Sequence, residues 1–505
     1  MRLSMAYPRL SRWQLNIVIV STILLATVVY RRYYMPEPLH NFRGRPPRIN
    51  DAPDDLISLG SSTAADRIEP NAHAFQDADE FLSHFRAVVN MQNLTTVEAN
   101  SSCHWDTKES EKYNFQLAGN HEWVKLNPPE ADIVLHRGRW QQFINSGMIP
   151  YGPNRDRFKG RGIVIVAGNE YTLTRTRTVL KALLKLGSKL PVEIHYYGDE
   201  MDQIAKDKIV KLYPNLYFND LASKENVFLA KWLQSANYQY KTAALFNSRF
   251  AENLLLDSDN LPVIDPEELF ESETYKKYGT LFWPDIIRTR PNNPAWAITN
   301  TGCRENEFEQ ESGQLLVDKR RFFYHLQLAA WWSNVYGSYY TGILLGDKDM
   351  FRFAWHALKT RYGFPPKWLT SVGTLHGDDY CGHSFAQHHP DGRVAFMHGG
   401  FLKTYSEPLL TYFRTQAGGV NQMYQRSKWD EQHQHNEVIQ FWFEGNNWLP
   451  NRPDDLKPAW CLKMEGVEIR PLDEIVPGYE KMFDECGGYW ILDEGLPEGN
   501  TFVHP

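Results

Sequence analysis

The stretch GIVIVAG, residues 162–168, decides the fold class of this chain. It is short, apolar and rich in β-branched residues, a pattern that is typical of a strand buried in a sheet. Residues 172–186 follow with apolar side chains at helical spacing, and Gly187 is placed to end that helix. A strand and a helix in immediate succession predict the first unit of a sheet that is covered by helices.

The same alternation continues along the next part of the sequence. We expect further strands at VEIHYYG (192–198), LYF (216–218) and LLL (254–256), with helices over 200–212 and 241–253. Alternating strands and helices predict an α/β fold with a mainly parallel sheet and flanking helices. Ligands bind such sheets at the carboxyl ends of the strands. The segments to search for a site therefore follow Val166, Tyr197 and Leu256.

Length and composition exclude several classes of protein. The chain has 505 residues, 42% apolar and 23% charged, which is ordinary for a globular protein and excludes a disordered, collagen-like or polytopic membrane protein. The net charge of −7 argues against a nucleic-acid partner, because a duplex binder usually carries a basic excess. Aromatic residues reach 14%, which suits stacking on sugars or bases but also suits a large core.

Five cysteines are scattered through the sequence: Cys103, Cys303, Cys381, Cys461 and Cys486. No CxxC pair occurs, so a structural zinc site has no support. Disulfides fit a secretory compartment, but the spacing does not decide which cysteines pair.

One long apolar run, residues 15–30, lies near the N-terminus and predicts a membrane anchor. As a helix it would extend about 24 Å, which fits the thinner membranes of the early secretory pathway. A cleaved signal peptide is the alternative, but the run is long and lacks a clear A-x-A site before Arg31. We expect a cytosolic tail over residues 1–14, the anchor at 15–30, a stem over 31–75 and a folded body over 76–505.

The orientation of this anchor rests on opposing signals. More arginines follow the apolar run than precede it, which by itself would place the body in the cytosol. Two N-glycosylation sequons, which begin at Asn93 and Asn100, argue for a luminal body. A long C-terminal domain is also translocated largely regardless of charge. We therefore expect a type II protein with a luminal body.

The fourth predicted strand leads into DSDN, residues 257–260, the most informative stretch of the sequence. The carboxylates of Asp257 and Asp259 at the end of a strand can hold Mg²⁺ or Mn²⁺ together with substrate phosphates. A metal there stabilises the charge that develops on a departing diphosphate. A simple Asx turn is the competing interpretation. A calcium loop is excluded, because Leu261 and Pro262 occupy the positions that need an oxygen ligand and glycine.

Several short pieces lie in order along the middle of the chain: GIVIVAG (162–168), GSKLPVE (187–193), LLLDSDN (254–260), WPD (283–285), ESGQ (311–314) with DK (318–319), and GDKD (346–349) with FR (351–352). Together they resemble the fungal α-mannosyltransferases of glycosyltransferase family 71, the mannan-branching group of the Golgi. The resemblance spans residues 162–403. It implies a GT-A fold, a type II anchor in the Golgi membrane, GDP-mannose as donor, Mn²⁺ as cofactor and retention of the α configuration.

Glu311 and Gln314 are candidate catalytic residues within this resemblance. They are three positions apart and could share one face of a helix. Their side chains could hold sugar hydroxyls or lie behind the anomeric carbon, and a capping or turn segment is the alternative. The resemblance implies an active-site edge, where one of the two residues would lie under the sugar.

Further candidates come from the remaining motifs. Asp347 precedes an aromatic segment that predicts a helix, and its position is typical of an N-cap. The resemblance implies that Asp347 also lines the substrate pocket. The resemblance likewise assigns Trp283 and Asp285 to the donor side of the site. Asp378, in the stretch HGDDY, is a candidate for contact with an acceptor hydroxyl, and a solvated turn is the alternative.

The stretch RVAFMHGG, residues 393–400, predicts another strand. Its apolar part leads into His398, and two glycines follow. The glycines after it allow the backbone to approach a ligand closely. Lys403 follows and is suited to a phosphate. The arrangement is similar to the histidine that completes the metal shell in many retaining GT-A transferases. We therefore assign Asp257, Asp259 and His398 to the metal, and Lys403 to the diphosphate.

The resemblance thus predicts a retaining, Mn²⁺-dependent α-mannosyltransferase that extends or branches mannose chains on glycoproteins, with an α-1,2 linkage favoured over α-1,3. Its partners would be a nucleotide-sugar donor, a mannose-containing acceptor and the Golgi membrane. The catalytic core would cover about residues 160–405, and no motif explains the extension over 406–505. A luminal glycoside hydrolase and a non-catalytic sugar-binding protein on a transferase fold are the alternatives. No feature of the sequence indicates the oligomeric state.

Overall fold

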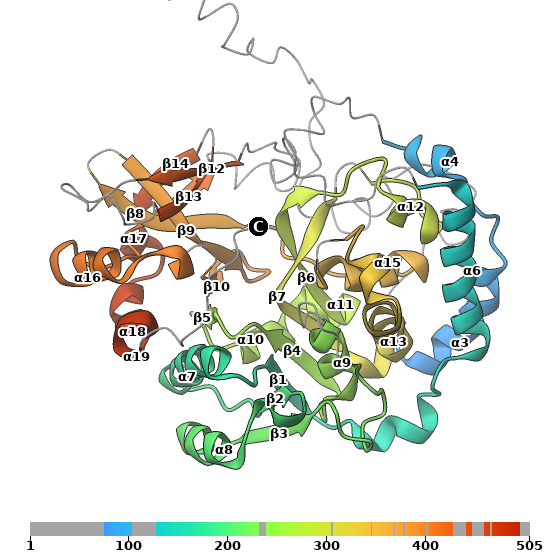
Figure 1. Ribbon diagram of the computed structural model, residues 1–505, viewed down its shortest axis with the longest axis horizontal. Helices are drawn as coiled ribbons and strands as arrows, with labels where there is room; N and C mark the ends of the chain where they lie inside the picture. The colour runs from blue at the N-terminus through green and yellow to red at the C-terminus, as the bar shows by residue number, and fades with distance from the viewer. Residues whose placement is uncertain are drawn as a thin grey trace, which may run out of the picture. The chain divides into compact units, whose positions relative to one another are not determined.

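The computed structural model describes residues 75–103, 128–231, 239–304, 307–344, 346–367, 369–376, 379–399, 402–427, 441–446, 459–464 and 467–494 (Figure 1). The predicted tail and anchor, and the predicted stem up to residue 74, lie outside these residues. Within the described residues, no helix is long and apolar enough to cross a bilayer.

A six-stranded sheet carries the first half of the fold, in the order β3-β2-β1-β4-β7-β6. Its strands are β1 (Arg161–Val166), β2 (Val192–Tyr196), β3 (Leu216–Asp220), β4 (Glu252–Leu256), β6 (Thr280–Arg288) and β7 (Phe308–Asp318). β3, β2, β1 and β4 are parallel, whereas β7 runs antiparallel to both β4 and β6. Every strand except β7 therefore has the same direction, which confirms the predicted α/β fold with a mainly parallel sheet.

Alternating side chains of this sheet belong to two separate cores. Val164 and Leu255 pack on one face, whereas Ile163, Ile165 and Leu254 pack on the other. Both faces are buried because helices cover both of them, which explains why these strands are apolar without alternation. The flanking helices are α7 (Glu170–Lys185), α8 (Gln203–Ile209), α9 (Gln239–Asn247), α13 (Lys319–Val335) and α15 (Lys348–Ala357).

The helices predicted over residues 172–186, 200–212 and 241–253 correspond to α7, α8 and α9, and the helix predicted after Asp347 corresponds to α15. α13 was not predicted, and one helix boundary is clearly wrong. A helix was expected over residues 241–253, but α9 ends at Asn247. Ser248 Oγ donates a hydrogen bond to the side chain of Asn253 over 2.5 Å, and the chain turns there to enter β4. The apolar periodicity of the helix runs directly into the apolar strand, so the sequence pattern hid this turn.

A group of N-terminal helices packs on the side of α13 (Figure 1). It consists of α3 (Ala78–Val89), α4 (Thr96–Asn100) and α6 (Glu130–Ser146), with α12 (Pro294–Ile298) against α4 and α6. A disulfide joins Cys103 to Cys303 and so ties the segment after α4 to the segment after α12.

A second, antiparallel sheet follows in the sequence and was not predicted, apart from the strand at residues 393–400. Its path is β12-β13-β9-β8-β11-β14, and β10 pairs with both β9 and β5. Its strands are β5 (Asn260–Pro262), β8 (Thr370–His376), β9 (Asp379–His388), β10 (Val394–His398), β11 (Met423–Ser427), β12 (Phe441–Asn446), β13 (Ala459–Met464) and β14 (Val467–Pro471). A disulfide between Cys381 and Cys461 joins β9 to β13, and Cys486 is a free, buried thiol.

The C-terminal helices bring the chain back to α7. α16 (Glu407–Gln416), α17 (Leu472–Ile475), α18 (Tyr479–Glu485) and α19 (Trp490–Glu494) end the described chain. α19 contacts α7 and α16, and Figure 1 shows α18 and α19 in red beside α7. The remaining short elements are η3 (Gly152–Arg157), η4 (Gly198–Glu200), η5 (Val210–Leu212), α10 (Glu267–Glu271), α11 (Glu273–Tyr278), α14 (Gly337–Tyr340) and η6 (Leu402–Thr404).

Candidate metal centre

The predicted carboxylate pair lies on the turn between β4 and β5. Asn260 N donates to Asp257 O over 3.1 Å and closes this turn. β5 pairs antiparallel with β10, which places His398 opposite Asn260. Gly399 N donates to Asp259 O over 3.1 Å and ties the end of β10 to the same turn. Strand pairing across a long stretch of sequence therefore brings His398 beside the two aspartates.

Asp257, Asp259 and His398 form a compact group. His398 Nε2 lies 3.5 Å from Asp259 Oδ1 and 3.9 Å from Asp257 Oδ2. One ligand atom from each residue lies within 4.8 Å of the other two. Two carboxylate oxygens and one imidazole nitrogen suit Mn²⁺, and three protein ligands leave positions for substrate oxygens. The residues present fit a divalent metal.

The other ring nitrogen of His398 faces Glu311. Nδ1 lies 3.7 Å from Glu311 Oε1, so a second carboxylate helps to fix the orientation of the ring, as in many metal-binding histidines. Burial disfavours the imidazolium, but Glu311, Asp259 and Asp257 outweigh burial and raise the pKa of His398 to about 9. The ring also needs the space above Gly313, because a Cβ there would lie 2.5 Å from His398 Cε1.

Lys241 is a site residue that the sequence did not single out. Its ammonium lies 2.8 Å from an Asp257 carboxylate oxygen and 3.8 Å from Asp347 Oδ2. Burial lowers the pKa of Lys241, but Asp257 and Asp347 outweigh burial and raise it. α9 begins at the carboxyl edge of the sheet because it runs antiparallel to β4, so a lysine in its first turn points at the site.

Arg175 and Lys403 flank the second aspartate. Arg175 Nη1 lies 3.0 Å and Lys403 Nζ 3.3 Å from Asp259 Oδ2. Although burial opposes it, these two cations hold the pKa of Asp259 well below its usual range. Lys403 was predicted from the sequence as a site residue, whereas Arg175 was not. Arg175 lies in the second turn of α7, the helix that follows the carboxyl end of β1.

Glu311 and Gln314 lie on strand β7, so the expectation that they share a helical face is wrong. Neighbouring positions of a strand face opposite sides, and residues three apart therefore separate. Glu311 stays at the site beside His398. Gln314 is fully buried, and its carbonyl oxygen accepts a hydrogen bond from Asn260 Nδ2, so it supports the turn that carries the aspartates.

The other predicted residues have distinct positions. Trp283 is buried in the core, where its indole N–H donates to His388 O over 2.8 Å, so it is not presented to the metal group. Asp285 forms an ion pair with Lys348 at the start of α15. Asp347 occupies the N-cap position of α15 without a capping hydrogen bond and instead faces Lys241. Asp378 lies outside the described residues.

Comparison with known proteins finds similarity to mannosyltransferases over part of this chain. Residues 160–310 and 303–389 match the family Mannosyl_trans3, described as mannosyltransferase. The chain is 29% identical over 381 residues to α-1,2-mannosyltransferase MNN21 of Candida albicans, with 64% of this chain and 55% of the relative covered. It is 34% identical over 179 residues to α-1,2-mannosyltransferase MNN2 of Saccharomyces cerevisiae, with 34% of this chain and 28% of the relative covered.

The matches therefore span about half or less of the length of these relatives. Among solved structures, the chain is similar to the galactosyltransferase LgtC in complex with donor and acceptor sugar analogs. That likeness has a TM-score of 0.30 and 12% identity, and covers 40% of this chain and 73% of the other.

Proposed function

We propose that this chain, whose residues 160–389 belong to the mannosyltransferase family, transfers mannose from GDP-mannose to mannose residues of glycoprotein glycans or mannan. The observation that carries the proposal is the group of Asp257, Asp259 and His398 at the carboxyl edge of a mainly parallel sheet. Paired carboxylates there suit a metal-bound diphosphate leaving group. Because the matched relatives are named α-1,2-mannosyltransferases, we favour an α-1,2 linkage over α-1,3.

Asp257, Asp259 and His398 Nε2 would hold Mn²⁺, which would supply positive charge to the departing diphosphate. Lys403, 34% exposed beside Asp259, would bind the same diphosphate from the open side. Its compact ammonium can reach a phosphate oxygen while it still faces the aspartate. This division assigns the more buried side chains to the metal and the partly exposed ammonium of Lys403 to the substrate.

Glu311 is the better of the two predicted catalytic groups. Its side chain is 14% exposed, it accepts a hydrogen bond from Gly313 N over 2.7 Å, and it lies beside His398 at the site. Burial raises the pKa of Glu311, and His398 opposes this rise. A carboxylate in this position could stabilise positive charge at the anomeric carbon from the face opposite the acceptor, whether or not it forms a covalent bond. Gln314 instead acts as a support for the turn.

A GT-A-like catalytic body in the lumen of the Golgi, on a type II anchor, completes the proposal. The two disulfides, Cys103–Cys303 and Cys381–Cys461, favour an oxidising compartment. Asn93, the first residue of a glycosylation sequon, is exposed. Protease added to sealed microsomes should leave the body intact, and digestion of the body would contradict a luminal placement.

The direct test is a transfer assay with the purified chain, GDP-mannose, Mn²⁺ and an α-mannoside acceptor. We expect an α-linked product, loss of transfer with a chelator and recovery when Mn²⁺ is restored. Asp257→Asn should lower transfer at least about 100-fold, since ligand loss removes the metal. Asp156→Asn, a change at an exposed position in η3, is the matched control. Metal-independent hydrolysis would favour a glycosidase. Absence of transfer to every acceptor tried would contradict the proposal that the chain is an enzyme.

A further inference from the structure

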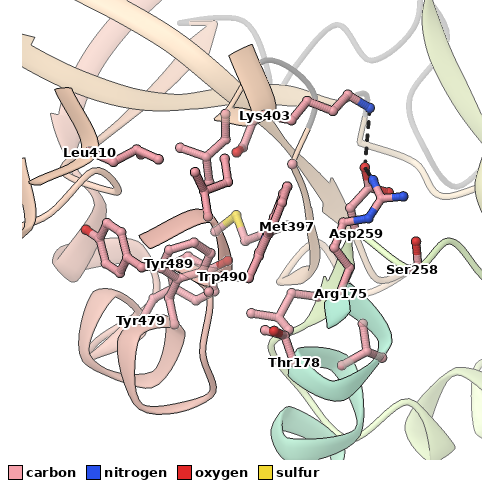
Figure 2. Close-up of a pocket in the computed structure, with 18 residues that line it drawn as sticks. Arg175, Thr178, Ser258, Asp259, Met397, Lys403, Leu410, Tyr479, Tyr489 and Trp490 are labelled. Atoms are coloured by element: carbon pink, nitrogen blue, oxygen red, sulfur yellow. Dashed lines mark hydrogen bonds and ion pairs between the residues drawn. The ribbon is translucent and has the colours of Figure 1, made fainter. Parts of the chain in front are cut away.

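A cavity opens beside the metal centre, between α7 and the C-terminal helices. Arg175, Asp259 and Lys403 line one side of it, and Tyr479, Tyr489 and Trp490 line the other. Figure 2 shows the charged side chains together on one side and the aromatic side chains opposite them. Residues from the extension after position 406 therefore form a wall of a cavity that reaches the predicted metal ligand Asp259.

Arg175 has hydrogen-bonding capacity in this cavity that the described residues do not use. Its residue is only 9% exposed, and Nη1 is engaged with Asp259. Its Nε, however, is buried without a hydrogen-bond partner among the described residues. A buried donor without a partner is costly, so a ligand oxygen is the natural partner for it. A guanidinium offers a planar set of donors that matches the oxygens of a phosphate.

Two aromatic rings hold the guanidinium of Arg175 in place. Its Cζ lies over the Tyr171 ring, 4.1 Å from the ring centroid. The Tyr171 ring in turn meets Trp490 of α19 edge to face, with centroids 5.1 Å apart and an interplanar angle of 87°. Cation–π and aromatic contacts of this kind restrict a long, flexible side chain. A chain of contacts therefore connects Trp490 to Asp259 through Tyr171 and Arg175.

The C-terminal segment is fixed along α7 by polar contacts as well. Thr178 Oγ1 donates to Gly487 O over 2.9 Å, and Lys185 forms an ion pair with Glu485. Thr178 is one turn beyond Arg175 on the same helix. The segment between α18 and α19 therefore has a defined position relative to the guanidinium, which a loosely attached extension would not have.

We propose that Arg175 is a second cation of the diphosphate subsite, and that Trp490 and Tyr171 are its positioning residues. This inference rests on the proposed function, because it assigns the ligand as a nucleoside diphosphate. Arg175 and Lys403 approach the same oxygen, Asp259 Oδ2, so a diphosphate held at this carboxylate by a metal lies within reach of both. The C-terminal extension is then part of the donor site.

The test is the affinity of the full chain for GDP, GMP and guanosine with Mn²⁺, measured by titration calorimetry. Arg175→Gln should weaken GDP binding about 10-fold or more, as expected for loss of a charge-assisted hydrogen bond, and should change GMP binding much less. Arg177→Gln is the matched control, because Arg177 lies on the same helix and pairs with Glu170. It should leave the affinity for GDP within about twofold.

Separate variants test the positioning role of Trp490 and Tyr171. Trp490→Ala should weaken GDP binding several-fold and leave GMP binding unchanged, whereas Trp490→Phe should retain most of the affinity because it keeps an aromatic edge at Tyr171. Tyr171→Leu should reproduce the effect of Trp490→Ala without any change in the C-terminal segment. If Trp490→Ala fails to fold, Trp490→Phe and Tyr171→Leu still decide this point, since equal GDP affinity in Tyr171→Leu and wild type would overturn it.

Two outcomes would overturn the assignment of Arg175 while leaving the transferase proposal intact. One is an unchanged GDP affinity in Arg175→Gln, and the other is an equal loss for GDP and GMP, which would mean that Arg175 does not read the second phosphate. A wild-type chain that binds no GDP under any condition would instead overturn the proposed function itself. The binding readout therefore separates the two failures.

Discussion

Lys241 and Asp257 form an ion pair, 2.8 Å between nitrogen and oxygen, with only 16% and 23% of their side chains exposed. The pair places a fixed positive charge next to a predicted metal ligand. It also offsets the repulsion between Asp257 and Asp347, since both carboxylates face the same ammonium.

Lys241→Met should destabilise the chain, because it leaves two largely buried carboxylates without their cation. Loss of one partner of such a pair typically costs about 3 kcal/mol, and we expect a loss of this order in the free energy of unfolding. Lys241→Arg should retain most of the wild-type stability, because it keeps a cation at this position. Chemical or thermal unfolding in chelator is the measurement, with Lys208→Met on the exposed face of α8 as control. Equal stability of Lys241→Met and Lys208→Met would refute this role.

Gly313→Ala should weaken metal binding without removing any ligand. A methyl group at this position would lie 2.5 Å from His398 Cε1, so the imidazole has to move away from the aspartates. We expect the affinity for Mn²⁺, measured by calorimetry or electron spin resonance, to fall about 10- to 100-fold. His398→Gln should give at least the same loss. Gly138→Ala on α6, where no atom lies within 4 Å of the new Cβ, should bind Mn²⁺ normally.

The two disulfides predict the thiol count of the isolated chain. Without reductant, the unfolded chain should show one reactive thiol, from Cys486, and after reduction it should show five. The native chain should react slowly, because burial raises the pKa of the Cys486 thiol. Reduction should lower the free energy of unfolding by about 2–5 kcal/mol. The variant Cys486→Ser should show no thiol before reduction, and three or more thiols in unreduced wild type would contradict the pairing.

Stability should fall as the pH drops from about 6.5 towards 4, partly because of His383. Burial lowers the pKa of His383 to about 4, although the carbonyl of Val420, 2.8 Å from Nε2, favours the imidazolium. In this window the unfolded chain binds a proton that the folded chain does not, so lower pH favours unfolding. One such histidine contributes about 1.4 kcal/mol per pH unit.

His383→Gln should therefore flatten the dependence of the unfolding midpoint on pH between 7 and 5. Other buried histidines with lowered pKa values, His136 and His356, keep part of the slope. The comparison uses slopes and not absolute midpoints, since the substitution itself changes packing. An unchanged slope in His383→Gln would show that the imidazole does not take up this proton on unfolding.

Strands β1, β2, β3 and β4 of the first sheet could be predicted from the sequence because each of their units is local, whereas β6 and β7 were not predicted. An apolar strand, a turn and an amphipathic helix follow one another within a short segment, and the pattern of each is visible on its own. The second sheet could not be predicted in this way. β8 and β9 form a hairpin, but β11, β13 and β14 join them from much later in the chain. Their register depends on tertiary pairing and not on a local pattern.

The same contrast between local pattern and tertiary position decides which site residues could be predicted. Asp257 and Asp259 stand out because two carboxylates follow an apolar strand, and His398 stands out because it ends another. Arg175 and Lys241 were missed because a single cation on an amphipathic helix normally faces solvent. The usable signal was position: both lie within the first two turns of helices that begin at the carboxyl edge of the sheet. Spacing alone misled for the pair Glu311 and Gln314, since residues three apart share one face of a helix but lie on opposite sides of a strand.

The hydrogen bond from Thr178 to Gly487 joins residues 309 positions apart, and it has a consequence for biosynthesis. A ribosome completes α7 and the aspartate turn well before the cavity wall beside Arg175, because Gly487 follows Thr178 by 309 positions. A chain that has not yet reached Gly487 therefore lacks one wall of the cavity beside Asp259, however well its first sheet has folded. Premature termination shortly before Gly487 would release a protein that keeps the candidate metal ligands Asp257, Asp259 and His398. On the proposed donor site, this protein should bind the donor more weakly.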